Sequence, residues 1–187
     1  MTLVNQTTQH TILTGAEGPA AEVINPGGLA PVCLVCEHAS AFIPASLDQL
    51  GVAPDHRQSH AAWDLGGRDL AVALSHALDA PLVASRVSRL VYDCNRPPSA
   101  PGAIPTKSEV IDVPGNASLT DAQRAARVTD VYNPFRTLLR DTLDGFTTPP
   151  AIVTIHTFTP LWFGEPRKVE LGLLHDTDDR LAQAMLA

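Results

Sequence analysis

Three short apolar runs along the chain have the length and composition of β-strands. They cover residues 31–38 (PVCLVCEH), 81–93 (PLVASRVSRLVYD) and 151–158 (AIVTIHTF). Apolar and β-branched runs of this kind are typical of strands buried on both faces of a parallel sheet. The run 81–93 contains two arginines, so part of it should reach a polar surface or a site. A further strand is predicted at 169–176 (VELGLLHD).

Two segments with helical spacing of apolar residues lie between and after these runs. The first is 65–78 (LGGRDLAVALSHAL), where one face of the predicted helix carries Leu70, Leu74 and Leu78. The second is 178–187 (DDRLAQAMLA), which predicts a short helix at the end of the sequence.

The strongest helix signal covers residues 120–143. Thr120 and Gln123 have the spacing of a capping box, which marks a helix N-terminus. A 3.6-residue period follows, carried by Val128, Val131, Phe135, Leu138 and Leu139. Pro134 lies inside this helix and should kink it, because proline lacks the backbone N–H.

Strands that alternate with helices indicate an α/β domain with a mainly parallel or mixed central sheet. The length of 187 residues fits a single domain, 1–187. Residues 1–30 are expected to be a loosely packed segment that ends in the turn-like NPGG at 25–28. The stretch 97–114 has five prolines and no periodic pattern, so it is predicted to be a long loop.

The composition and net charge of the chain argue against several classes of partner and site. The net charge of −7 argues against nucleic-acid and membrane-surface partners, because both are polyanionic. No apolar run reaches the roughly 20 residues that span a bilayer, and the first residues do not have the pattern of a signal peptide, so a cytoplasmic location is expected. The sequence has three cysteines, Cys33, Cys36 and Cys94, and this odd number argues against a framework of disulfides. Cys33 and Cys36 are three residues apart in a predicted strand and would face opposite sides of the sheet, so they would not bind one metal ion. We therefore expect buried thiols.

Two histidines, His38 and His156, directly follow the apolar parts of the runs 31–38 and 151–158. Ligands of open parallel sheets bind beyond the carboxyl ends of the strands, so the two imidazoles would converge if their strands are neighbours. Two neutral imidazoles and a carboxylate are a common catalytic zinc set, and Glu37 and Asp64 are the nearest acids in sequence. The alternative is that each histidine only caps a strand or lies on the surface.

A second group of polar residues follows the run 81–93. Arg89, Asp93 and Arg96 cluster there, and guanidinium groups suit bidentate binding of a carboxylate or phosphate. The alternative is a structural ion pair between Asp93 and an arginine, with Asp93 and Asn95 as turn residues ahead of Pro97.

Four motifs taken together resemble the N-formylglutamate amidohydrolase family. They are CEHAS with IP at 36–44, WDLGG at 63–67, SRLVYDCNRP at 88–97 and IHTF at 155–158, and the similarity runs from about residue 31 to the end. The resemblance implies a zinc carboxypeptidase-like fold, a three-layer α/β/α sandwich. It also implies hydrolysis of N-formyl-L-glutamate to formate and glutamate, a late step of histidine breakdown.

Carried over by motif, the resemblance assigns metal and substrate residues. His38 and His156 would bind zinc, and Asp64 matches the acid of the family's third motif and would be the third ligand. Glu37 is less favoured as a ligand, since better-characterised members resemble PHSG there. Substrate carboxylates would bind Arg89, Asn95 and Arg96. In the mechanism that we expect, Arg89 or a neighbour stabilises the oxyanion and Arg96 fixes the carboxylate.

The general base is the point at which the sequence departs from the family. Known members continue into a strand with a glutamate base, so the family's C-terminal part is expected to be missing here. Glu37 is the candidate substitute, although adjacent side chains on a strand diverge. The expected activity is zinc-dependent hydrolysis of an N-acyl amino acid such as N-formyl-L-glutamate. The alternatives are a carboxypeptidase-like peptide hydrolase and a noncatalytic protein that binds carboxylates.

Overall fold

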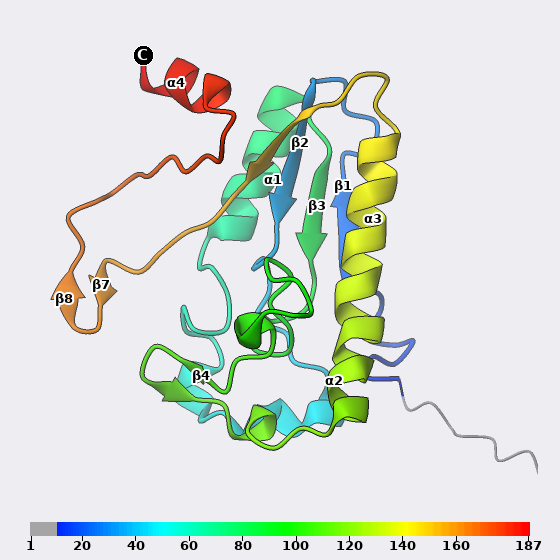
Figure 1. Cartoon of the computed structure of the whole chain (residues 1–187), viewed down its shortest axis with the longest axis vertical. Helices are drawn as coiled ribbons and strands as arrows, with labels where there is room; N and C mark the ends of the chain where they lie inside the picture. Colours follow the sequence, from blue (N-terminus) through cyan, green and yellow to red (C-terminus); the bar gives the residue numbers. More distant parts are fainter. Residues whose placement is uncertain (1–10) are drawn as a thin grey trace, which may run out of the picture.

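A mixed four-stranded sheet forms the centre of the computed structural model, which describes residues 11–187. The strand order is β1-β3-β2-β6, with bounds Ala21–Ile24 (β1), Leu82–Ser85 (β3), Val32–Cys36 (β2) and Ala151–Thr154 (β6). β2 is parallel to both β3 and β6, whereas β1 is antiparallel to β3. The carboxyl ends of β2, β3 and β6 therefore meet at one edge of the sheet (Figure 1).

The predicted strand runs 31–38 and 151–158 are confirmed as β2 and β6. Leu34 pairs with Leu82 on one side of β2 and with Val153 on the other. Alternate β2 residues enter two different apolar clusters: Leu34 and Cys36 lie in the cluster with α1 (Gly67–Leu78), and Cys33 and Val35 lie in the other. β2 is thus buried on both faces, as its uninterrupted apolar sequence predicts.

The run 81–93 forms a strand only as far as Ser85, so its predicted extent is wrong. The backbone N–H of Val87 donates to the Ser85 hydroxyl at 3.2 Å, and that of Leu90 donates to the Ser88 hydroxyl at 3.2 Å. Serine hydroxyls of this kind offer the backbone an alternative to the strand ladder. The apolar residues of the segment are buried under the turns: Val87, Leu90, Val91 and Tyr92.

Helix α1 confirms the prediction for 65–78, but its packed face is not the leucine stripe. The buried positions are Gly67, Ala71 and Ser75, small residues that allow the helix to approach the sheet closely. Leu70 and Leu78 remain 47% and 49% exposed.

The predicted helix 120–143 is confirmed with an interruption. It consists of α2 (Asp121–Arg127), a π-helical turn (Val128–Tyr132) and α3 (Asn133–Asp144). The capping box of Thr120 and Gln123 is present. The π-helical turn ends directly before the first turn of α3, which contains Pro134, so the helix hydrogen bonding changes where the proline N–H is missing. Val131 and Phe135 are buried against the sheet, as their spacing predicts.

Outside the sheet the structure is built from short elements. The loop 97–114 contains a 3-10 turn, Pro101–Ala103 (η3), and a small hairpin of Lys107–Ser108 (β4) and Ile111–Asp112 (β5). Three more 3-10 turns lie at Ala45–Gly51 (η1), Pro54–His56 (η2) and Pro114–Asn116 (η4). After β6 the chain leaves the sheet as an arm with the bounds Leu161–Trp162 (β7), Glu165–Pro166 (β8) and Arg180–Leu186 (α4) (Figure 1). None of the described helices is long and apolar enough to cross a membrane.

Two further expectations need correction. Residues 169–176 form no strand; Leu171 and Leu174 are 81% and 95% exposed, so this apolar run has no neighbouring strand to pair with. Part of the N-terminal segment 1–30 is well packed rather than loose, because β1 pairs with β3 and Ala21 is buried. Residues 1–10 lie outside the described part of the chain.

Candidate metal centre

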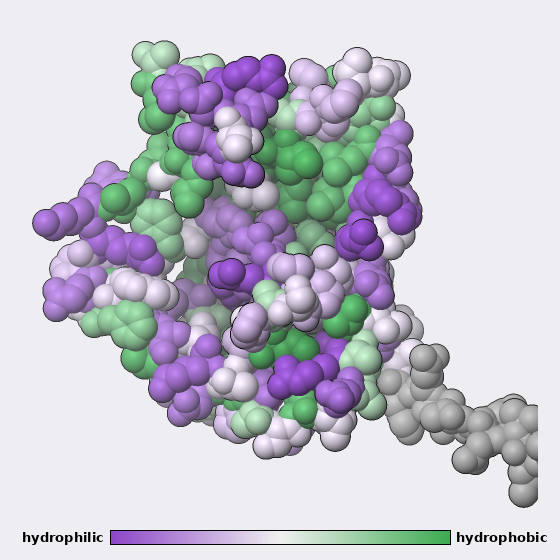
Figure 2. Space-filling view, viewed as in Figure 1, coloured by the Kyte–Doolittle hydropathy of each residue, from purple (hydrophilic) through white to green (hydrophobic). Residues whose placement is uncertain are grey.

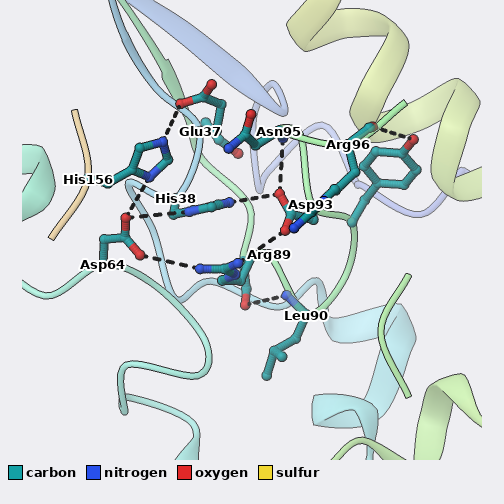
Figure 3. Close-up of polar contacts among 12 residues, drawn as sticks. Glu37, His38, Asp64, Arg89, Leu90, Asp93, Asn95, Arg96 and His156 are labelled. Atoms are coloured by element: carbon teal, nitrogen blue, oxygen red, sulfur yellow. Dashed lines mark hydrogen bonds and ion pairs between the residues drawn. The ribbon is translucent and has the colours of Figure 1, made fainter. Parts of the chain in front are cut away.

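His38 lies two residues beyond the end of β2 and is 3% exposed. Its ring Nε2 lies 2.7 Å from Oδ1 of Asp93, and its Nδ1 faces Oδ2 of Asp64 at 3.4 Å. The backbone N–H of Asp64 donates to the carbonyl of His38 at 3.0 Å, which holds the 63–67 segment against the end of β2. His38 is thereby fixed from both sides (Figure 3).

Asp64 is brought to the same point by the turn that starts α1. The backbone N–H of Gly67 donates to the Asp64 carbonyl at 2.9 Å, and Gly66 between them has φ +74°. That left-handed conformation suits glycine, so the WDLGG sequence accounts for the sharp turn from Asp64 into the helix.

His156 completes the cluster from β6. Its Nδ1 lies 2.9 Å from Oδ2 of Asp64, the oxygen that His38 also faces. The two imidazole rings are 4.9 Å apart between centroids. One ligand atom from each of His38, Asp64 and His156 lies within 4.8 Å of the others, so the structure brings together all three residues predicted to bind metal.

The charges of this cluster depend on one another. Burial alone would raise the pKa of Asp64, but the hydrogen bond to His156 and the nearby imidazole of His38 outweigh it and hold that pKa well below its usual value. Burial alone would lower the pKa of His38, yet the carboxylates of Asp64 and Asp93 raise it. The pKa of Asp93 is lowered as well: burial alone would raise it, but the contacts with His38 and Arg89 outweigh that effect.

The donor set fits a divalent cation. Nδ1 of His38 is buried and has no hydrogen-bond partner within residues 11–187, although it points at the shared oxygen of Asp64. A hydrogen bond from Nε2 to a carboxylate is the usual arrangement of a metal-binding histidine, because it leaves Nδ1 unprotonated. Within residues 11–187, Asp64 and Asp93 share a single arginine, Arg89, and Glu37 has none in contact, so an added cation would be favoured electrostatically.

Arg89 bridges the two aspartates. Its guanidinium contacts Asp64 at 3.5 Å and Asp93 at 3.2 Å, and its side chain is 30% exposed. The structural ion pair proposed as an alternative for Asp93 is therefore present. The same contacts hold the partly exposed guanidinium beside the candidate metal site.

Asn95 and Arg96 lie on the turn after Asp93. The backbone N–H of Asn95 donates to Oδ1 of Asp93 at 3.0 Å, and that of Arg96 to the Asp93 carbonyl at 2.9 Å. The Tyr92 hydroxyl donates to the Arg96 carbonyl at 3.2 Å. Both Asn95 and Arg96 are exposed, and neither side chain makes a hydrogen bond or ion pair with the rest of residues 11–187. The turn is thus fixed by its backbone while two polar side chains stay free.

Sequence reasoning missed the role of Asp93 as the partner of His38. A signal existed in the four-residue spacing of Arg89 and Asp93, but the sequence does not show which histidine the acid faces. His60 lies four residues before Asp64 in the sequence, but its ring contacts Glu109, outside the cluster. Cys33, Cys36 and Cys94 are free and buried as predicted, and burial raises the pKa of Cys33 to about 11 and of Cys36 to about 12.

The surface near the carboxyl edge of the sheet contains both polar and apolar regions. Figure 2, in the same view as Figure 1, shows polar side chains gathered below α1 and β2, next to an apolar surface between α1 and α3. The fold and site together define an α/β protein with a candidate metal site at the carboxyl edge of its sheet.

Comparison with known proteins then gives the family. A model of the N-formylglutamate amidohydrolase family matches residues 30–187, so the chain belongs to this family of hydrolases. The crystal structure of gene product Atu2144 from Agrobacterium tumefaciens is similar to the chain, with 48% sequence identity and a TM-score of 0.90 over 94% of this chain and 71% of that one. No curated protein matches the chain. The resemblance drawn from the four sequence motifs is confirmed.

Proposed function

We propose that the protein is a zinc-dependent hydrolase that cleaves the amide bond of a small acidic N-acyl amino acid, such as N-formyl-L-glutamate. The observation that carries the proposal is the convergence of His38, Asp64 and His156 at one edge of the sheet. Family membership supplies the reaction class. We also infer that the two apolar clusters on either side of β2 are the two interfaces of an α/β/α sandwich.

The residues that would hold the ion are His38 through Nδ1, His156 through Nδ1 and Asp64 through Oδ2. Zinc bound there would supply a Lewis acid for the scissile carbonyl and a site for the attacking water. Asp93 keeps His38 in the tautomer with a free Nδ1, because its carboxylate can only accept a hydrogen bond at Nε2.

Arg89 is suited to stabilise negative charge that develops on the substrate oxygen. Asp64 and Asp93 hold its guanidinium in place before substrate arrives, so little reorganisation is needed during the reaction. Asn95 and Arg96 would bind a substrate carboxylate, since their free side chains lie on the turn that Asp93 anchors.

The first test combines metal content with product release. Protein purified without chelators or a metal-affinity tag should contain about one zinc per chain and release formate from N-formyl-L-glutamate. Arg96→Ala should raise KM by at least about tenfold with zinc retained, since hydrogen bonds to charged groups contribute about 1.5–3 kcal/mol. Arg136→Ala, which removes an exposed arginine of α3, is the matched control.

Other outcomes separate the alternatives. Cleavage of dipeptides in preference to N-formyl-L-glutamate would replace the proposal with a carboxypeptidase-like activity. Zinc and carboxylate binding without any hydrolysis would indicate a noncatalytic binding protein. A cytoplasmic location and a role in histidine breakdown stay predictions.

A further inference from the structure

Glu37 is a buried acid with an unsatisfied oxygen. It follows directly after β2, next to His38, and is 6% exposed. Its Oε2 makes no hydrogen bond within residues 11–187. A buried carboxylate oxygen without a hydrogen bond is energetically unfavourable, which suggests that the contacts of this oxygen have a role in the site.

That contact is with His156. Oε2 of Glu37 lies 3.6 Å from Nε2 of the imidazole, slightly beyond hydrogen-bond distance (Figure 3). The other ring nitrogen, Nδ1, faces Asp64. Nε2 itself makes no hydrogen bond to the described part of the chain. The unsatisfied Oε2 therefore faces a ring nitrogen that makes no hydrogen bond to the described residues, and an approach of a few tenths of an ångström, well within side-chain motion, would form a hydrogen bond between them.

The arrangement repeats the one at His38. There Asp93 accepts a hydrogen bond at Nε2 and leaves Nδ1 directed at Asp64. At His156 the corresponding acid is Glu37, again on the Nε2 side. Metal-binding histidines commonly donate their second N–H to a carboxylate, which fixes the ring orientation and raises its basicity.

We propose that Glu37 is a positioning residue that holds His156 by accepting the Nε2–H hydrogen bond, with Nδ1 left for the metal. This inference rests on the proposed metal-dependent function. It differs from the role of general base predicted for Glu37 from the sequence. A base has to reach the proton that it removes, whereas the Oε2 contact lies behind the imidazole, on the side away from Asp64.

Zinc affinity tests the proposal directly. Glu37→Gln keeps the shape and one acceptor oxygen but removes the charge, and Glu37→Ala removes the acceptor. Zinc affinity, measured by competition with a chromophoric chelator, should fall by about 10-fold for Glu37→Gln and by up to about 100-fold for Glu37→Ala. Asp93→Asn should give a loss of similar size at His38. Glu170→Gln, an exposed acid on the arm, is the control for removing one negative charge and should leave the affinity unchanged.

A cobalt-substituted protein adds a readout that does not depend on turnover. The visible absorption of bound Co²⁺ reports ligand geometry, so both Glu37 variants should shift its bands while Glu170→Gln leaves them unchanged. If Glu37→Ala does not fold, as judged by circular dichroism, the isosteric Glu37→Gln carries the test alone.

The outcomes distinguish this inference from the proposed function. Wild-type protein that binds no metal would overturn both. Wild-type binding with unchanged affinity and cobalt spectrum in the Glu37 variants would overturn only the positioning role. Loss of turnover in Glu37→Gln with unchanged metal affinity would assign Glu37 to the general base instead.

Discussion

The two histidines of the candidate metal centre lie in very different surroundings. His38 follows the central strand β2, is 3% exposed and has Asp93 within 2.7 Å. His156 follows the edge strand β6, its side chain is 31% exposed, and Glu37 lies 3.6 Å away. One half of the site is thus fixed by the core, while the other is fixed by a few polar contacts at the margin of the sheet. Residues of the same type at equivalent strand ends can therefore differ in how firmly the fold holds them.

The largest expected effect is loss of the metal. His38→Ala and His156→Ala should each reduce bound zinc from about one equivalent to nearly none, because each removes one of the three proposed ligands. The two variants should also differ in stability when metal is absent.

His38→Ala leaves the buried Asp93 without its imidazole partner and should lower the free energy of unfolding by about 1–3 kcal/mol. His156→Ala should lower it less, because that side chain is partly exposed. Elemental analysis and urea unfolding measure the two effects, and full zinc retention in either variant would remove that residue from the ligand set.

A smaller contrast is expected between the strands that carry the histidines. Leu34→Ala in β2 should lower the free energy of unfolding by about 2–5 kcal/mol, because Leu34 is 1% exposed and its removal leaves a cavity. Ile152→Ala in β6 should change it by about 0.5 kcal/mol, since Ile152 is 54% exposed. Urea denaturation with equal m-values would measure both. Equal losses would show that β6 is held as firmly as β2.

The smallest expected effect is a pH dependence of the metal-free protein. The raised pKa of His38 means that its contribution to stability is fully present below its ordinary value of 6.5 and is lost as the pH rises through the folded-state value. The lowered pKa values of Asp64 and Asp93 act in the acid range instead, because their contributions disappear only as the pH falls below the usual 3.8. Chelator-treated protein should therefore have a higher Tm at pH 6 than at pH 8. His38→Gln should reduce this difference, and an unchanged difference would mean that His38 is not its source.

Local signals in the sequence were sufficient for the elements that carry the site. The apolar runs that end in His38 and His156 predicted β2 and β6, and the capping box at Thr120 predicted the start of α2. These features depend on residues close together in the chain. The sequence places the two histidines together because parallel neighbouring strands end at the same edge of a sheet.

Other features depend on contacts between distant segments, which one sequence does not show. The leucine stripe of α1 suggests a packed face, yet Leu70 and Leu78 are about half exposed and the buried positions are Ala71 and Ser75. The run 81–93 has strand composition throughout, but serine hydroxyls satisfy its backbone after Ser85 and the chain turns away. The partner of Asp93 is 55 residues away in sequence, so its hydrogen bond to His38 had no local signal.

The parallel register of β2 and β6 determines which residue of the β6 segment lies beside His38. Val35 lies opposite Thr154, and the Ile155 N–H donates to the Val35 carbonyl at 2.8 Å. A slip of β6 by one residue would turn the His156 side chain to the opposite face of the sheet and present Ile155 or Thr157 in its place. A slipped chain would therefore lack one of the three proposed ligands. A metal ion bound as proposed would therefore stabilise chains with the native register of these strands over chains with a slipped register.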